Sequence, residues 1–238
     1  MIKKVKRKRL NLKRTIFFIL LIYVMCYSFY YILNQPIKHI YITGNSLVKD
    51  SDIIRLSNLK DYPSIFKYRN NTIEKKIKKH KLIDQVDVKK TFGFTININI
   101  VENKILFYYL NEEKIMLSNG NLVKNDLETL VGIPTFINEC SKELLQKFQE
   151  GFSKLNTNII FEIDSIEYFP NINNDGKLLS DNRFKILMND GNTIIVNTKS
   201  VNVLNKYNDI YASLGGKSGI INLDSDKLSN LVFIPYGE

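Results

Sequence analysis

The sequence predicts an α+β protein that is anchored in a membrane. We expect a single N-terminal transmembrane helix, then a small domain with the element order βααββ, then a larger mixed β-sheet domain with two or more helices. Three observations support this expectation. An unbroken apolar run, Ile16–Leu33, follows a basic tail. Residues 37–104 change between strand and helix periodicity, and residues 105–238 hold short apolar segments separated by turn residues.

The apolar run is long enough to cross a membrane once. At 1.5 Å per residue it covers roughly 27 Å, against a hydrocarbon core of about 30 Å, and its uncharged flanks extend it. We therefore expect the span at residues 15–36. The tail, residues 1–14, carries eight Lys and Arg and no acid. Under the positive-inside rule this tail stays in the cytoplasm, and the rest of the chain lies outside.

A cleaved signal peptide is the alternative interpretation of this N-terminus. Signal peptides have an apolar region of about 7–15 residues that ends at small residues. The run is longer here, and Ala212 is the only alanine in the chain, so there is no A-x-A cleavage site. Four tyrosines at the outer end of the run also favour a membrane anchor, because amphipathic rings prefer the headgroup level; they are Tyr23, Tyr27, Tyr30 and Tyr31.

The formal net charge of +10 does not indicate a nucleic-acid partner. Eight of the 34 basic residues lie in the tail, which leaves 26 bases against 24 acids outside. Residues 38–104 carry 14 bases and 7 acids, whereas residues 105–238 carry 12 bases and 17 acids. This change of sign favours two exterior domains of ordinary size.

The few cysteines and histidines predict neither a disulfide nor a metal site. Cys26 lies in the expected span and Cys140 lies far outside it, so the two cannot form an intramolecular bridge. His39 and His80 are isolated from each other and from Cys140, whereas metal sites use three or four ligands. We expect no cofactor and no metal.

The small domain is expected to begin with a strand and two helices. Residues 37–43 alternate apolar and polar side chains and end at a Gly-Asn turn pair. A short helix is expected at residues 49–56. A second helix should start at Asn71, which stands three residues before Glu74 as in a capping box, and should end near Lys81.

A hairpin should complete the small domain. Residues 85–90 and 95–102 alternate valine or isoleucine with polar side chains, and a Phe-Gly-Phe turn at residues 92–94 separates them. The order strand, helix, helix, strand, strand predicts a three-stranded sheet with both helices on one face.

The larger domain is predicted from short strands and two helices. Asp190-Gly191 favours a hairpin turn, and Gly215 is typical of a helix end. One helix should start at Ser141 and continue through Phe152, and the other should cover residues 200–214. The expected strands are residues 105–110, 163–169, 184–188, 193–197, 219–223 and 231–234.

This order of parts resembles the FtsQ/DivIB family of bacterial cell-division proteins, which have a POTRA domain next to the membrane and a β domain beyond it. The resemblance covers nearly the whole chain, with the POTRA domain at residues 37–104 and the β domain at 105–238. It rests on Ile37-Lys38-His39-Ile40-Tyr41-Ile42-Thr43-Gly44-Asn45, Thr95–Asn103, Asp190-Gly191 and Ile220-Ile221-Asn222-Leu223. The chain departs from the family pattern at Asn103, where Arg is usual, and at Asn222, where Asp is usual.

The resemblance implies a non-enzymatic role at the division septum. It implies binding to single-pass division proteins of the FtsL and FtsB/DivIC type, with septal cell-wall synthases as further partners, and help in regulating septal cell-wall synthesis. It also places the docking site for the FtsB/DivIC-type partner on the C-terminal strands. The expected partner-binding residues are Ile220, Ile221, Asn222, Leu223, Leu231, Val232, Phe233, Ile234 and Tyr236.

The same surface follows from the position of the last strand. A final strand has no successor to pair with, so it can form a sheet edge that accepts another protein's strand. Alternation should place Leu231 and Phe233 on one face and Val232, Ile234 and Tyr236 on the other. The alternative interpretation is that Val232 and Phe233 only complete the core.

A serine transpeptidase is the strongest enzymatic alternative. Three fragments follow the order of penicillin-binding enzymes: Ser64-Ile65-Phe66-Lys67, Ser180-Asp181-Asn182 and Lys217-Ser218-Gly219. Chance explains them better, because such short motifs need a structural context, and the first lies in a loop while the last follows a helix end. For the same reason Gly215-Gly216-Lys217-Ser218 is interpreted as a helix end and not as a phosphate loop.

Two other features leave alternatives open. Five lysines at positions 75, 76, 78, 79 and 81 crowd one helix and either contact anionic lipid or simply form a solvated face. The overall plan also suits a POTRA-type scaffold of another envelope complex, such as a translocation or sporulation system.

Overall fold

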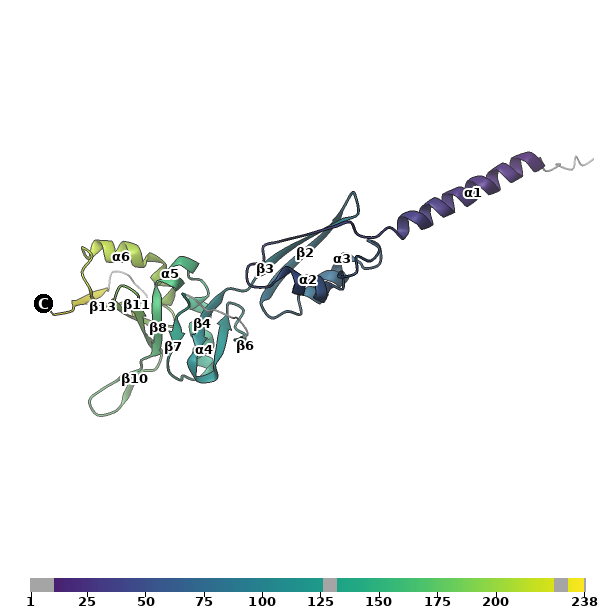
Figure 1. Cartoon of the computed structure of the whole chain (residues 1–238). Helices are drawn as coiled ribbons and strands as arrows, with labels where there is room; N and C mark the ends of the chain where they lie inside the picture. The colour runs from purple at the N-terminus through teal and green to yellow at the C-terminus, as the bar shows by residue number, and fades with distance from the viewer. Residues whose placement is uncertain (1–10, 126–131, 225–230, 238) are drawn as a thin grey trace, which may run out of the picture. The chain divides into compact units, whose positions relative to one another are not determined.

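The computed structural model describes residues 11–125, 132–224 and 231–237. The chain divides into two compact units, residues 1–102 and residues 103–238. Each unit has its own sheet and its own buried core (Figure 1).

Helix α1, Leu12–Leu33, contains the expected apolar run. It is long and apolar enough to span a membrane, and none of its residues is buried against the rest of the chain. Asn34 ends the helix, and its side-chain amide donates to the Tyr30 carbonyl over 2.8 Å. Most of the expected basic tail, residues 1–10, lies outside the described residues.

The first unit has the predicted βααββ order, with a three-stranded sheet in the order β1-β3-β2. Strand β1 is parallel to β3, and β2 is antiparallel to β3, so the predicted hairpin is confirmed. Both helices lie over one face of the sheet (Figure 1), where Ile96, Ile98 and Ile100 are buried. The elements are β1 His39–Thr43, α2 Asp50–Ser57, α3 Asn70–Ile77, β2 Ile83–Thr91 and β3 Thr95–Glu102.

Helix α3 differs from the prediction at both ends. The capping box is wrong: the helix begins at Asn70, and the Glu74 carboxylate accepts the backbone N–H of Val88 over 3.1 Å. The expected end near Lys81 is also wrong, because α3 ends at Ile77. Tight turns then carry the chain into β2 and bury Leu82, so contacts with the sheet outweigh local helix preference.

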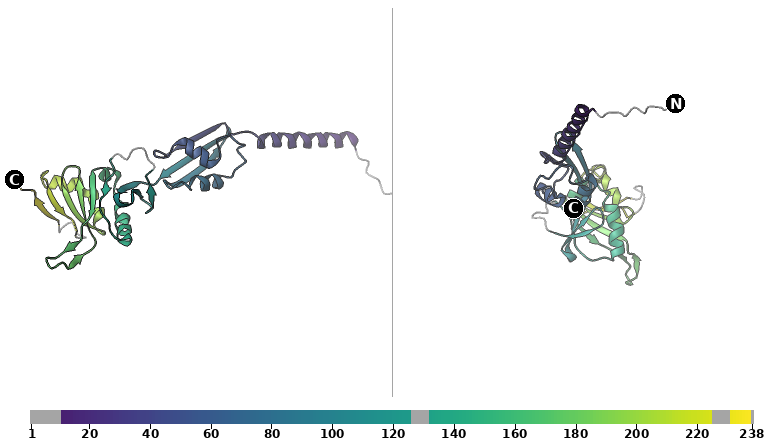
Figure 2. Two further views of the ribbon diagram at one scale, coloured as in Figure 1. Left: turned by 60° about the horizontal axis from the view of Figure 1, so that its bottom comes forward. Right: turned by 90° about the vertical axis from the view of Figure 1, so that its right-hand side faces the viewer.

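The second unit is built on a sheet that has nine strands among the described residues, in the order β14-β13-β12-β11-β8-β7-β4-β5-β6. Its sheet strands are β4 Ile105–Tyr109, β5 Lys114–Leu117, β6 Leu122–Lys124, β7 Thr135–Phe136, β8 Ile163–Tyr168, β11 Arg183–Met188, β12 Thr193–Asn197, β13 Gly219–Asn222 and β14 Val232–Pro235. The helices are η1 Leu110–Glu112, α4 Lys142–Phe152, α5 Thr157–Phe161, η2 Val201–Lys206 and α6 Tyr207–Ser213. A separate two-stranded hairpin, β9 Asn171–Ile172 and β10 Leu178–Ser180, projects from the sheet (Figures 1 and 2).

An aromatic cluster forms the centre of the second core. The rings of Phe148 on α4 and Phe184 on β11 are 4.1 Å apart, and both side chains are fully buried. Phe107, Phe136 and Phe152 complete the cluster. Aromatic burial of this kind supplies much of a core's stability, which this unit needs because Cys140, its only cysteine, has no partner.

The helices of the second unit confirm one prediction and correct another. Ser141 is the N-cap of α4 and its hydroxyl accepts the Leu144 N–H, as its position before the apolar pattern predicts. The continuous helix expected at residues 200–214 is wrong: its first half is the tighter η2, and only Tyr207–Ser213 is α-helical. Helix α5 and the β9–β10 hairpin were not predicted.

Candidate partner-binding edge

Strand β14 lies at one end of the nine-stranded sheet, so among the described residues it pairs with β13 alone. Strand β13 runs parallel to β12, with Ile194 opposite Ile221, and β14 runs antiparallel to β13, with Phe233 opposite Ile221. No strand of the described residues pairs with the other side of β14. Such an edge is a template for strand addition.

The side chains of the two strands divide into a buried set and an exposed set. Ile221 and Leu223 are buried in the core, and Leu231 and Phe233 are partly buried against it. Ile220 and Asn222 are half-buried. In contrast, Val232 is 53% exposed and Ile234 is 55% exposed, with Tyr236 exposed beside them. This is the alternation expected from the sequence, and it leaves an apolar row on the outer face of the edge strand.

Gly219 allows β14 to approach β13 closely. A Cβ atom at this position would lie 2.4 Å from the Ile234 carbonyl oxygen and 2.6 Å from the Phe233 ring. A larger residue would push the edge strand away. Tyr236 fixes the end of the strand, because its N–H donates to the Ser218 carbonyl and its hydroxyl to the Thr193 hydroxyl over 2.7 Å.

A buried polar network fixes the start of β13. The Asn192 side chain is fully buried; its Oδ1 accepts the Gly219 N–H over 2.8 Å, and its Nδ2 donates to the Tyr207 hydroxyl over 2.9 Å. That hydroxyl donates to the Asp190 carboxylate. Burial, followed by this carboxylate, raises the pKa of Tyr207 far above its ordinary value. The network connects the β11–β12 turn, α6 and β13, so the edge has a rigid base.

A second set of contacts fixes the other end of β13. Arg183 on β11 pairs with Asp224, just beyond β13, with 2.8 Å between Nε and Oδ2. The Asn197 side chain also donates to the Asp224 carbonyl. The parallel β12–β13 pairing is therefore held from both ends, and the sequence pattern alone did not reveal either anchor.

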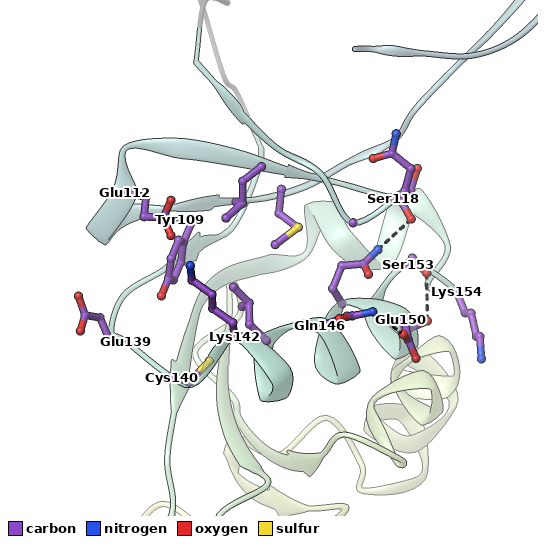
Figure 3. Close-up of a pocket in the computed structure, with 16 residues that line it drawn as sticks. Tyr109, Glu112, Ser118, Glu139, Cys140, Lys142, Gln146, Glu150, Ser153 and Lys154 are labelled. Atoms are coloured by element: carbon purple, nitrogen blue, oxygen red, sulfur yellow. Dashed lines mark hydrogen bonds between the residues drawn. The ribbon is translucent and has the colours of Figure 1, made fainter.

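A separate open groove of about 980 Å³ lies between the β5–β6 hairpin and α4 (Figure 3). Its polar side chains are engaged in structural contacts: the Gln149 amide donates to the Ser118 carbonyl over 2.8 Å, and the Ser118 hydroxyl accepts the Lys104 N–H. Burial raises the pKa of the Cys140 thiol to about 11, which keeps it a poor nucleophile at neutral pH. Among its described lining residues, the Ser118 hydroxyl donates to Asn103 and the Ser153 hydroxyl to the Glu150 carbonyl, so neither serine is paired with a side chain that could act as a general base.

The three transpeptidase-like fragments are divided between the two units. Ser64 belongs to the first unit, where its hydroxyl donates to the Leu33 carbonyl. Ser180 and Lys217 belong to the second unit, and the Ser180 hydroxyl donates to Asn182 over 2.7 Å. The described residues also contain no group of three or more His, Cys, Asp or Glu that could hold a metal ion.

Comparison with known proteins finds relatives among bacterial cell division proteins. Residues 35–103 match the model of the FtsQ-type POTRA domain. The chain is 28% identical to cell division protein DivIB of Bacillus subtilis (strain 168), over 93% of this chain and 84% of the relative. It is 25% identical to DivIB of Brevibacillus brevis, over 98% of this chain and 89% of the relative. The chain is therefore similar to DivIB cell division proteins over nearly its whole length.

A solved structure is also similar to this chain. It is the major extracytoplasmic domain of the trans isomer of the cell division protein DivIB from Geobacillus stearothermophilus, with 19% identity, a TM-score of 0.37 and coverage of 48% of this chain and 96% of that chain. Together with helix α1, the similarity to the DivIB proteins supports a single-pass membrane protein with a role in bacterial cell division. We call residues 37–102 the POTRA unit and residues 103–238 the β unit.

Proposed function

We propose that this protein is a non-enzymatic component of the division machinery that binds other single-pass division proteins of the FtsL and FtsB/DivIC type. Through them it helps to regulate septal cell-wall synthesis, and septal cell-wall synthases are further candidate partners. Its N-terminus lies in the cytoplasm, and its POTRA and β units lie outside the membrane at the septum.

The observation that carries this proposal is the free edge of β14. It combines an outer side that no strand of residues 11–125, 132–224 or 231–237 pairs with and an outward apolar row, Val232, Ile234 and Tyr236. Strand addition draws affinity from the backbone and specificity from alternate side chains. The anchors at both ends of β13 support the proposal, because a rigid edge loses little conformational entropy when a partner strand binds. The partner-binding residues predicted from the sequence keep their role here, with Ile221 and Leu223 holding the edge from inside.

Partner binding by a surface variant tests the proposal. Ile234→Lys places a charge in the outward row without entering the core, and we expect it to abolish co-purification of the full-length chain with its FtsB/DivIC-type partner. Ile172→Lys is the matched control, because Ile172 on β9 has the same residue type and the same 55% exposure in the same unit. It should bind normally.

The binding result can be interpreted only if the variants are folded. Circular dichroism should show both variants folded, whereas Phe233→Lys should unfold the edge because that ring packs against the core. Normal partner binding by a folded Ile234→Lys protein would refute the β14 site. Loss of binding in Ile172→Lys as well would show that any added surface charge weakens the complex, and the assignment to β14 would fail.

A further inference from the structure

The link between the membrane helix and the POTRA unit fixes which end of that unit faces the membrane. Five residues, 34–38, separate the end of α1 from the start of β1. Five residues reach at most about 17 Å, so the start of β1 cannot lie far from the bilayer. Any segment that is hydrogen-bonded to this link lies at the membrane surface too.

The loop between α2 and α3 is bonded to the link. The Ile37 N–H donates to the Pro63 carbonyl over 3.0 Å, and the Ile65 N–H donates to the Gln35 carbonyl over 3.3 Å. Two aromatic side chains on this loop, Tyr62 and Phe66, are exposed.

The β2–β3 turn lies at the same end of the sheet (Figure 1). Strand β1 is parallel to β3, with His39 opposite Thr95, and the Lys38 N–H donates to the Phe94 carbonyl over 2.9 Å. At the tip of this turn Phe92 is completely exposed, at 105% of its reference area. Burial of such a ring in an apolar environment is favourable, so a covering surface would gain free energy from Phe92.

Basic side chains lie on the link and on the α2–α3 loop, each beside a further aromatic ring. The Lys38 Nζ lies 5.6 Å from the centre of the Phe94 ring, and the Lys67 Nζ lies 5.4 Å from that of Tyr68. The α2–α3 loop, residues 59–69, carries three bases and one acid. Aromatic rings beside lysines are the combination that favours the headgroup level of an anionic membrane.

The lysines that follow α3 lie at the opposite end of the POTRA unit. Asn70, at the start of α3, donates to the Val88 carbonyl near the β2–β3 turn. After α3 the chain enters β2 at Ile83, which pairs with Glu102 at the far end of β3. Seven residue steps of strand separate the two ends by about 25 Å. Lys78 and Lys79 therefore lie well beyond a Debye length of about 8–10 Å from the link.

We propose that the membrane-proximal end of the POTRA unit docks on the lipid surface outside the α1 span. Tyr62, Phe66 and Phe92 insert their rings at the headgroup level, and Lys38 and Lys67 contact anionic phosphate groups. The occupant is lipid because the membrane is already held against this end by α1. Docking would fix the direction in which the POTRA unit leaves the membrane, independently of any protein partner.

Tryptophan placed at the turn tests this docking directly. The chain contains no tryptophan, so Phe92→Trp gives a single probe in the full-length protein. We expect its emission to shift to the blue and to be quenched in nanodiscs that contain phosphatidylglycerol with brominated acyl chains. Val101→Trp is the matched control, since Val101 is an exposed apolar residue at the far end of β3. It should stay unquenched.

A second pair of variants tests the charges. A lysine near an anionic surface contributes a factor of about five in affinity, so Lys38→Gln with Lys67→Gln should weaken docking about 30-fold and reduce the quenching of the residue-92 probe. Lys78→Gln with Lys79→Gln removes the same charge at the far end and should have no effect. Equal quenching of the two tryptophans would overturn the proposal, and so would an unquenched residue-92 probe, which is the result expected if a protein partner covers these rings instead.

Discussion

The carboxylate of Glu102 holds the loop that joins β1 to α2, and its removal should open that loop. Its Oε2 accepts the Ser46 N–H over 3.0 Å, the Ser46 hydroxyl over 2.9 Å and the Leu47 N–H over 2.9 Å. Its Oε1 accepts the Val48 N–H over 2.8 Å. One carboxylate at the end of β3 therefore satisfies three consecutive backbone donors more than fifty residues earlier in the chain.

Glu102→Gln is the sharpest perturbation of this contact. In either orientation of the side-chain amide that this substitution introduces, its NH₂ group faces at least one of the backbone N–H groups of residues 46–48. About half of the hydrogen bonds to the carboxylate are then replaced by repulsion between two donors. Hydrogen bonds to charged groups contribute about 1.5–3 kcal/mol each when buried, but Glu102 is half-buried and solvent screens it. We therefore expect the opening free energy of residues 46–48 to fall by about 1–2 kcal/mol.

Hydrogen exchange of the full-length chain measures this change locally. A loss of about 1–2 kcal/mol lowers the protection of the residue 46–48 amides by about 5- to 30-fold at pH 7. Glu74→Gln is the control, because Glu74 accepts a single backbone hydrogen bond, from the Val88 N–H. This variant should lower the protection of the Val88 amide by less than Glu102→Gln lowers that of residues 46–48. Unchanged protection of residues 46–48 in Glu102→Gln would refute the reasoning.

The pH dependence of the same loop follows from the sign of the pKa shift. Burial alone would raise the pKa of Glu102, but the bonds from Leu47, Val48 and Ser46 outweigh it, and the pKa lies below its ordinary value of 4.5. A carboxylate whose pKa is lowered in the folded state stabilises the fold at every pH above its pKa in the unfolded chain. This stabilisation is lost as the pH falls through the pKa of the carboxylate in the folded state. Exchange protection, corrected for intrinsic rates, should therefore decline below about pH 4.5 in the wild type and stay flat in Glu102→Gln.

Three further changes have defined outcomes. Protease added to intact spheroplasts should degrade the chain after about Pro36 and spare the tail, whereas a protected exterior would reverse the proposed orientation. Ser64→Ala and Lys217→Ala should leave division normal in a complementation assay, because the proposed function is non-enzymatic; a filamentous phenotype with a stable Ser64→Ala protein would contradict this. Gly219→Ala should displace β14 and weaken the β unit by about 1–3 kcal/mol in denaturant unfolding, since its Cβ would lie 2.4 Å from the Ile234 carbonyl oxygen; an unchanged midpoint would mean that the edge strand adapts freely.

The POTRA unit could be predicted well because its strands alternate regularly. Ile96, Ile98 and Ile100 give a clear period of two, and β3 has the predicted bounds, Thr95–Glu102. The errors occur where long-range contacts decide the conformation. Glu74, which looked like part of a helix cap that begins at Asn71, instead accepts the Val88 N–H. Asn70 donates to the Val88 carbonyl, and the two bonds fasten α3 to the sheet.

The β unit could be predicted less completely, because its irregular parts depend on side-chain bonds to the backbone. The Asn197 carboxamide accepts the N–H groups of Lys199 and Ser200, which tightens the chain into η2 where a continuous α-helix was expected. In the unpredicted β9–β10 hairpin, Asn173 accepts the Lys177 N–H over 2.7 Å, next to Gly176 with a φ of +76°. An asparagine three residues before a glycine was the available turn signal.

The candidate edge shows why its residues could be named from the sequence while its support could not. Alternation alone separated the exposed Val232 and Ile234 from the half-buried Phe233. No pattern along the chain shows that Asn192, in a hairpin turn, accepts the Gly219 N–H, because that bond joins positions 27 residues apart. Such a buried amide matters to the proposed function, since a strand that adds to β14 gains most when β13 and β14 already hold their bound geometry. Asn192→Asp would keep the oxygen that accepts the Gly219 N–H but would remove the N–H that donates to the Tyr207 hydroxyl. It should therefore weaken partner binding, although it leaves the exposed side chains of Val232, Ile234 and Tyr236 unchanged.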